Sequence, residues 1–188
     1  MAFLRVLTLG LFLLWLVVDN AIVFGRRRQA TSRDSRVSLV VILIAKWIGV
    51  GAAITFGMLG LGGFGALAVP AQIAGLVVFF AGVAIRSAAI AQLGRFHTPD
   101  VAVQPGQRVV EVGLYRHVRH PSYLGGLLAL FGFGLGLGSW LGALVLLGVA
   151  LAAYLHRIGA EERALLDALG AEYGEYCKRT RRLIPGIY

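Results

Sequence analysis

Charged residues are scarce in this chain. Only 14% of its 188 residues are Asp, Glu, Lys or Arg, whereas soluble domains carry roughly 25%. Hydrophobic residues make up 58%, and the mean hydropathy is +0.79. This composition excludes an ordinary soluble domain. It predicts an integral membrane protein with a single membrane domain that spans residues 1–188.

Cysteine is nearly absent, and so are the common motifs of enzymes. The single Cys177 excludes an internal disulfide and a cysteine metal cluster. The four histidines, at positions 97, 117, 120 and 156, do not have metal-ligand spacing, so we predict no metal site. The chain also lacks a Gly-x-Gly-x-x-Gly fingerprint, a Walker loop, a His-Glu-x-x-His motif and a serine nucleophile elbow.

Acidic residues are few, and the nine of them leave a net charge of +9 against 18 basic residues. The basic residues lie beside apolar stretches, which favours contact with lipid headgroups over binding of nucleic acid. The abundance of Gly, Ala and Arg suggests a prokaryotic source, and therefore a location in the inner (cell) membrane.

Five apolar stretches predict an all-α fold with five transmembrane helices. Three of them lie in residues 1–92, and the first is read as a retained helix because it is too long for a signal peptide. In residues 93–188, the last two stretches are short and form a helical hairpin, followed by an amphipathic helix over residues 158–177. The predicted spans are residues 4–24, 37–61, 66–85 with a helical extension to 93, 123–137 and 141–155.

The distribution of basic residues predicts the orientation. Sixteen of the 18 lie in the first loop, in the third loop or in the C-terminal tail, where five spans put them all on one side. By the positive-inside rule, the N-terminus is outside and the C-terminus is cytoplasmic. Lys46 and Asp19 lie inside apolar spans instead, where a charge is costly. We expect a structural ion pair or a lysine that reaches the interface, although a role at a reaction centre is open.

A polar cluster stands directly before the predicted hairpin, and a second one stands directly after it. The first is the run Leu-Tyr-Arg-His-Val-Arg-His-Pro-Ser-Tyr-Leu-Gly-Gly at residues 114–126. The second contains Arg157, Glu161 and Glu162, of which the first two share a helix face. The first cluster alone fits an interfacial anchor of basic and aromatic residues. Together, the two clusters predict one ligand site, with a helix beginning at Pro121 and offering free NH groups.

These residues resemble the isoprenylcysteine carboxyl methyltransferase family, which is related to the phospholipid methyltransferases. The resemblance rests on Arg-His-Pro-Ser-Tyr-x-Gly at 119–125, on Arg-x-x-x-Glu-Glu at 157–162 and on Leu-Gly-x-Glu-Tyr-x-x-Tyr at 169–176. It implies transfer of a methyl group from S-adenosyl-L-methionine to the carboxylate of a lipid-like, isoprenylcysteine-type acceptor at the cytoplasmic face. The acceptor is a prenylated small molecule or protein.

The resemblance also implies roles for individual residues. It puts Arg157, Glu161 and Glu162 at the reaction centre, where Arg157 holds the acceptor carboxylate and Glu161 contacts the cofactor. Glu162 shares either role. The remaining cofactor contacts that it implies are Gln104, Gln107, Arg108, Val109, Val110, Tyr115, His120, Pro121, Ser122 and Tyr123.

Two other activities remain open at this point. A phospholipid N-methyltransferase would use the same cofactor site without needing a carboxylate clamp. A membrane reductase would instead bind NADPH, and a non-enzymatic scaffold would bind neither cofactor.

Overall fold

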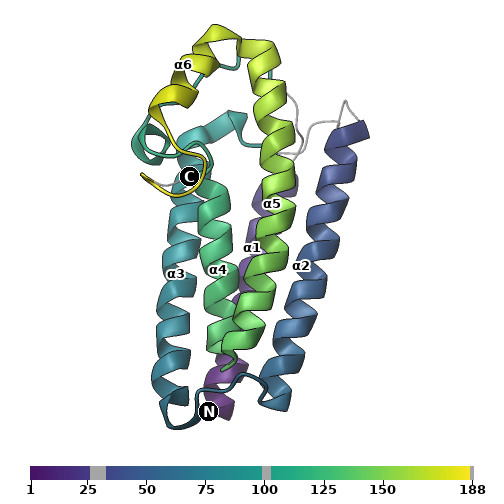
Figure 1. Cartoon of the computed structure of the whole chain (residues 1–188), viewed down its shortest axis with the longest axis vertical. Helices are drawn as coiled ribbons and strands as arrows, with labels where there is room; N and C mark the ends of the chain where they lie inside the picture. Colours follow the sequence, from purple (N-terminus) through teal and green to yellow (C-terminus); the bar gives the residue numbers. More distant parts are fainter. Residues whose placement is uncertain (26–32, 99–102, 187–188) are drawn as a thin grey trace.

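The fold is a bundle of long helices with a short helix and several loops gathered at one end, which we call the polar end (Figure 1). The computed structural model describes residues 1–25, 33–98 and 103–186, apart from the side chains of residues 23, 24 and 33–36. Within these ranges every regular element is helical, which confirms the all-α prediction. The long helices are α1 (Ala2–Gly25), α2 (Arg33–Leu59), α3 (Ala68–Leu93), α4 (Pro121–Gly136) and α5 (Trp140–Leu169). The short ones are α6 (Ala171–Arg179) and the 3-10 turns η1 (Gly65–Leu67), η2 (Gly94–Phe96) and η3 (Gly113–Arg116).

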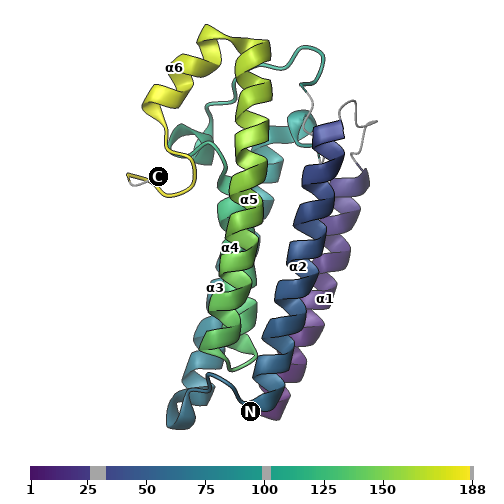
Figure 2. The same ribbon diagram turned by 45° about the vertical axis from the view of Figure 1, so that its right-hand side comes forward.

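Four of the long helices, α1, α2, α3 and α5, are long and apolar enough to cross a membrane. The fifth, α4, is apolar but has only 16 residues, or about 24 Å at 1.5 Å per residue. It packs along α3 and α5 in the middle of the bundle (Figure 2). An integral membrane protein is thus confirmed, whereas the number of five spans stays a prediction.

The long helices run along the bundle in alternating directions (Figure 1). The N-terminus lies at one end, and η2, η3 and α6 lie at the other. This polar end carries the basic residues of the third loop and of the tail that predicted the orientation. Arg26, Arg27 and Arg28 of the predicted first loop lie outside the described residues.

Glycines let α4 approach its neighbours closely. A Cβ placed on Gly125 would lie 2.5 Å from the backbone nitrogen of Arg86 on α3, and one on Gly134 would lie 2.5 Å from the Cα of Ala143 on α5. Both positions therefore need a residue without a side chain, as in other closely packed membrane helices. On a further face of α4, Phe133 stacks on Phe12 of α1, with ring centroids 3.9 Å apart.

The end of the hairpin differs from the prediction. Instead of a span that ends near residue 155 and a separate helix over residues 158–177, α5 is one helix of 30 residues that continues to Leu169. The segment after residue 155 is rich in Ala, Leu, Glu and Arg, which favour helix, and nothing in it breaks one. The break comes at Gly170, whose φ of +54° is unfavourable for other residues. The amphipathic helix α6 begins there.

Candidate functional site

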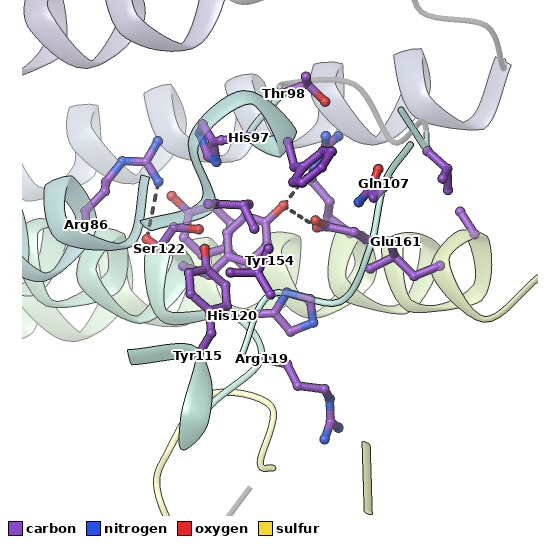
Figure 3. A pocket seen from close by; sticks show the side chains of 18 of the residues that line it. Arg86, His97, Thr98, Gln107, Tyr115, Arg119, His120, Ser122, Tyr154 and Glu161 are labelled. Atoms are coloured by element: carbon purple, nitrogen blue, oxygen red, sulfur yellow. Dashed lines mark hydrogen bonds between the residues drawn. The ribbon is translucent and has the colours of Figure 1, made fainter. Parts of the chain in front are cut away.

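A large cavity occupies the polar end of the bundle. It contains about 1490 Å³ of empty space, including its opening to solvent. Its walls come from α1, α2, α3, α5 and α6, from the loop that follows η2, from η3 and from the start of α4. Figure 3 shows that side chains from these distant segments point toward a common space.

Ten of the predicted site residues line this cavity. His120 and Glu161, which the sequence separates by a whole helical hairpin, both contribute to its wall. The prediction that the two polar clusters meet at one site is therefore confirmed by the geometry, while the role of each residue stays a prediction. The ten are Gln107, Arg108, Val109, Val110, Tyr115, His120, Ser122, Tyr123, Arg157 and Glu161.

Tyr123 connects the two clusters at the centre of the site. Its hydroxyl donates to Glu161 Oε2 at 2.9 Å and accepts from Arg157 Nε at 3.0 Å. The guanidinium also donates from Nη1 to Ser38 Oγ of α2 at 2.9 Å, and only 4% of Arg157 is exposed. The i,i+4 spacing of Arg157 and Glu161 thus puts them on one face, as predicted. Tyr123 stands between them and fixes both.

Pro121 begins α4, as its lack of an NH and its fixed φ predict. Its predecessor His120 has φ −125° and ψ 55°, outside the helical region, and its side chain makes no capping hydrogen bond. This geometry presents His120 and Ser122 to the cavity, whereas Pro121 itself is not part of the wall. The NH groups predicted to face a ligand at this helix start stay a prediction.

Glu162 is also outside the cavity wall. It accepts from Arg119 Nε at 2.8 Å and from Arg182 Nε at 2.9 Å, and His120 Nε2 lies 3.4 Å from it. The last described residues run beside the segment before α4, because Arg119 N donates to the Arg181 carbonyl at 2.7 Å and His120 N to that of Arg182 at 3.0 Å. The position of Glu162 thus ties the C-terminal tail to His120, and its predicted role at the reaction centre remains untested.

The loop over the cavity is held by a tight turn. Gln107 N donates to the Gln104 carbonyl at 2.9 Å, and Gly106 has the positive φ of 71° that the third residue of a type II turn requires. The Gln104 NH in turn donates to Gln107 Oε1 at 2.7 Å. Gln104 is therefore part of the turn that supports the loop, and it is not part of the cavity wall.

Three tyrosines form an aromatic wall near the polar opening. Tyr115, Tyr173 and Tyr176 are all buried, and Tyr176 Oη donates to the Tyr115 carbonyl at 2.7 Å. Burial raises the pKa of all three hydroxyls, so they are neutral at physiological pH. The Tyr173 hydroxyl has no hydrogen-bond partner among the described residues.

Sequence reasoning missed several cavity residues. His97, Thr98 and Tyr154 line the cavity, and so does Arg86, which was counted among the basic residues of the third loop for the orientation. Arg86 lies inside α3 instead, and both its Nε and its Nη2 donate to the carboxylate of Asp19 on α1. Asp19 does form a structural ion pair, but its partner is Arg86 and not Lys46. The signal that could have found this pair is a charged residue within the helical extension of an apolar span.

Within the described ranges, no three His, Cys, Asp or Glu side chains are grouped so that they could hold a metal ion. The polar lining is instead a mixed set of aromatic rings, two carboxylates, two histidines, one lysine and guanidinium groups. Such a lining suits an organic ligand with both apolar and charged parts.

Comparisons with known proteins point to one family. The model of the isoprenylcysteine carboxyl methyltransferase family matches residues 74–167, half of the chain. A protein-S-isoprenylcysteine O-methyltransferase of Schizosaccharomyces pombe is 32% identical over 105 residues, which are 55% of this chain and 44% of that protein. The protein-S-isoprenylcysteine O-methyltransferase A of Arabidopsis thaliana is 32% identical over 115 residues, 60% of this chain and 58% of that protein.

The matched region extends from near the start of α3 to near the end of α5. The chain spans about half the length of the curated relatives it matches. Both of these relatives are eukaryotic, and the prokaryotic source suggested by the composition stays a prediction. Residues 74–167 hold both polar motifs and the hairpin between them. The chain therefore belongs to the isoprenylcysteine carboxyl methyltransferase family.

Proposed function

We propose that this protein transfers a methyl group from S-adenosyl-L-methionine to the carboxylate of a lipid-like acceptor of the isoprenylcysteine type. The observation that carries the proposal is the single cavity in which Tyr123 joins the two family motifs through Glu161 and Arg157. The relatives are named protein-S-isoprenylcysteine O-methyltransferases, which agrees with this chemistry. The positive-inside rule gives the cavity a cytoplasmic opening.

The polar half of the cavity suits the cofactor. S-adenosylmethionine has an adenine ring, a ribose and a zwitterionic amino acid, and it supplies a methyl group already activated by the sulfonium charge. Tyr115 and Tyr173 offer flat faces for the ring, and Glu161 offers a carboxylate for hydroxyl or amino groups. The Tyr173 hydroxyl, which has no hydrogen-bond partner among the described residues, is one further donor. We infer that the cofactor is held by the aromatic wall together with His120, Ser122, Tyr123 and the loop residues 107–110.

The inner half of the cavity suits the acceptor. Trp15 on α1 and Leu39, Ile42 and Leu43 on α2 give it an apolar wall inside the membrane-spanning bundle. A prenyl or acyl chain can therefore lie among these side chains, while its acidic group faces the polar half. Arg157 stands at the boundary between the halves, on the chain of hydrogen bonds through Tyr123.

The reaction needs little acid–base chemistry. An oxygen of the acceptor carboxylate forms a bond to the methyl carbon, the bond from that carbon to sulfur breaks, and its electron pair stays on sulfur. The products are a methyl ester and S-adenosylhomocysteine, and no proton is released because the acceptor reacts as its anion. The protein's part is to align the two partners and to exclude water. Arg157 and Tyr123 would hold the carboxylate end in line.

Calorimetry with S-adenosylhomocysteine tests the cofactor site. We expect the wild-type protein to bind it, and Glu161→Gln to bind it at least 10-fold more weakly because a charge-assisted contact is lost. Glu175→Gln is the control, since Glu175 is exposed and pairs only with Lys178 in the described region. Absence of binding to the wild-type protein would overturn the proposed cofactor.

A methyl-transfer assay with N-acetyl-S-farnesylcysteine tests the acceptor. We expect formation of the methyl ester, and little product from Arg157→Ala. Transfer to an amine lipid but not to this carboxylate would identify a phospholipid N-methyltransferase instead. Binding of NADPH without binding of S-adenosylhomocysteine would identify a reductase.

A further inference from the structure

Three charged side chains lie at the inner end of the cavity, on three membrane-spanning helices. Asp19 comes from α1, Lys46 from α2 and Arg86 from α3, and all three line the cavity. Arg86 donates hydrogen bonds to both oxygens of the Asp19 carboxylate, from Nε to Oδ1 and from Nη2 to Oδ2, the latter at 3.0 Å. Its Nη1 donates to the Ser122 carbonyl at 3.3 Å. Asp19 is thus already neutralised by a two-pronged arginine contact.

Lys46 has no such partner. Within the described part of the chain, its ammonium group makes no hydrogen bond and no ion pair, although the charges of Asp19 and Arg86 act on it. Among the described residues that line this end of the cavity there are two basic side chains and one carboxylate, so a protonated Lys46 carries a positive charge that Asp19 does not pair with. A charge at membrane depth is costly unless a counter-charge or water meets it. A lysine that faces a ligand cavity can obtain that counter-charge from the ligand.

The helical position of Lys46 fits a ligand contact. Leu39, Ile42, Leu43 and Lys46 follow the i, i+3, i+4, i+7 pattern of one helix face, and all four line the cavity. Ser38, the α2 residue that accepts from Arg157, is eight residues before Lys46. Eight residues correspond to about 12 Å along the helix axis. Arg157 and Lys46 therefore lie at two levels of the same cavity. Arg157 is at the boundary, and Lys46 starts from the membrane side, from which its four-carbon stem can extend back toward a carboxylate held at the boundary.

We propose that Lys46 binds the acceptor carboxylate from the membrane side and so makes the enzyme select acidic lipids. This inference rests on the proposed function. Arg157 is held by Tyr123 and Ser38, so it is a rigid contact, whereas the four-carbon stem of a lysine lets its ammonium follow the carboxylate. The acceptor class is then a lipid-soluble monocarboxylate whose apolar chain lies along Leu39, Ile42 and Leu43.

The same contact would help release the product. Before transfer, the carboxylate carries the negative charge that pairs with Lys46. After transfer, the acceptor is a neutral ester, and the attraction to the ammonium is lost. The enzyme would thus bind the acid more tightly than the ester, and the excess positive charge at Lys46 would provide that difference.

Lys46→Met tests this role, because methionine keeps the length of the side chain and removes its charge. The only other lysine, Lys178, is exposed on α6 and far from the apolar wall, so Lys178→Met is the matched control. Lys46→Arg restores a cation. Calorimetry of each variant and of the wild-type protein would use N-acetyl-S-farnesylcysteine, its methyl ester and S-adenosylhomocysteine.

We expect the wild-type protein to bind the acid at least 10-fold more tightly than the ester. Lys46→Met should lose this preference, with weaker binding of the acid, unchanged binding of the ester and unchanged binding of S-adenosylhomocysteine. Lys46→Arg should regain most of the preference, and Lys178→Met should behave as wild type.

The outcomes separate the two proposals. If Lys46→Met keeps the wild-type preference for the acid, the role of Lys46 is wrong and the proposed function stands. If the acid binds no better than the ester to the wild-type protein while methyl transfer still occurs, the selection of acidic lipids is wrong. If the wild-type protein binds neither S-adenosylhomocysteine nor the acid, both proposals fail.

Discussion

Glu162 offers the sharpest test of how this site is held together, because it lies behind the cavity wall and joins three segments. Its carboxylate contacts Arg119 and His120 before α4 and Arg182 in the tail. Glu162→Gln keeps the size of the side chain and one carbonyl oxygen, but it removes the negative charge. We expect the tail to loosen and His120 to lose its fixed orientation.

The expected loss of stability follows from the three contacts. The pair with Arg119 is well buried, with side chains 10% and 12% exposed, so it counts as a charge-assisted hydrogen bond of about 1.5–3 kcal/mol. The pair with Arg182 is 40% exposed on the arginine side and is worth under about 1 kcal/mol. The contact with His120 is long, at 3.4 Å, and adds little. Since glutamine keeps a neutral acceptor, the net loss is about 2 kcal/mol.

A loss of this size lowers Tm by about 4–8 °C in a chain of this length. Thermal unfolding of the detergent-solubilised protein measures it, with Glu175→Gln as the control. That control removes the same charge from an exposed pair with Lys178, whose side chains are 64% and 72% exposed, and should leave Tm unchanged. The affinity for S-adenosylhomocysteine should fall in Glu162→Gln only. If Glu162→Gln and the wild-type protein have the same Tm, the contacts of Glu162 do not stabilise the fold.

Three further predictions follow from single side chains. Tyr123→Phe removes the hydroxyl between Arg157 and Glu161, so kcat/KM for methyl transfer should fall about 10- to 100-fold, and an unchanged value would contradict its central position. Gly125→Ala puts a Cβ 2.5 Å from the backbone nitrogen of Arg86 and should destabilise the fold by about 1–3 kcal/mol, whereas Gly148→Ala meets nothing within 4 Å and should not, as chemical denaturation would measure. Burial raises the pKa of the Cys177 thiol, so its alkylation by iodoacetamide should increase with pH only above the ordinary thiol value of about 8.5, and an inflection below that value would contradict the burial.

The membrane helices were predictable because apolar length is a local property. Hydropathy placed all five apolar helices, the sequence also indicated the extension of α3 to Leu93, and the properties of proline indicated that a helix begins at Pro121. It failed at the end of α5, because the change from apolar to charged residues after residue 155 signals where a helix leaves an apolar environment and not where it ends. Backbone preference decides the end, and Gly170 was the residue to weigh.

The meeting of the two clusters could also be predicted, since a short hairpin returns the chain to the side from which it came. What the sequence could not separate was the roles of neighbours within each cluster. Glu161 and Glu162 are adjacent, yet 100° of helical rotation turns one to the cavity and the other to Arg119 and Arg182. Only the packing of α5 against the tail decides which of the two faces the cavity.

The same limit applies to the charges within the membrane, and it bears on function. Asp19 had two possible cationic partners on other helices, Lys46 and Arg86. The sequence alone does not show which of the two pairs with it. In the structure both oxygens of the Asp19 carboxylate accept from Arg86, and Lys46 lies beside the apolar wall without an ion pair to the described residues. If Lys46 served only to balance Asp19, an ion pair between the two side chains would be expected. The structure shows no such pair, and an anion bound in the cavity is one way to offset the cost of a lysine at this depth.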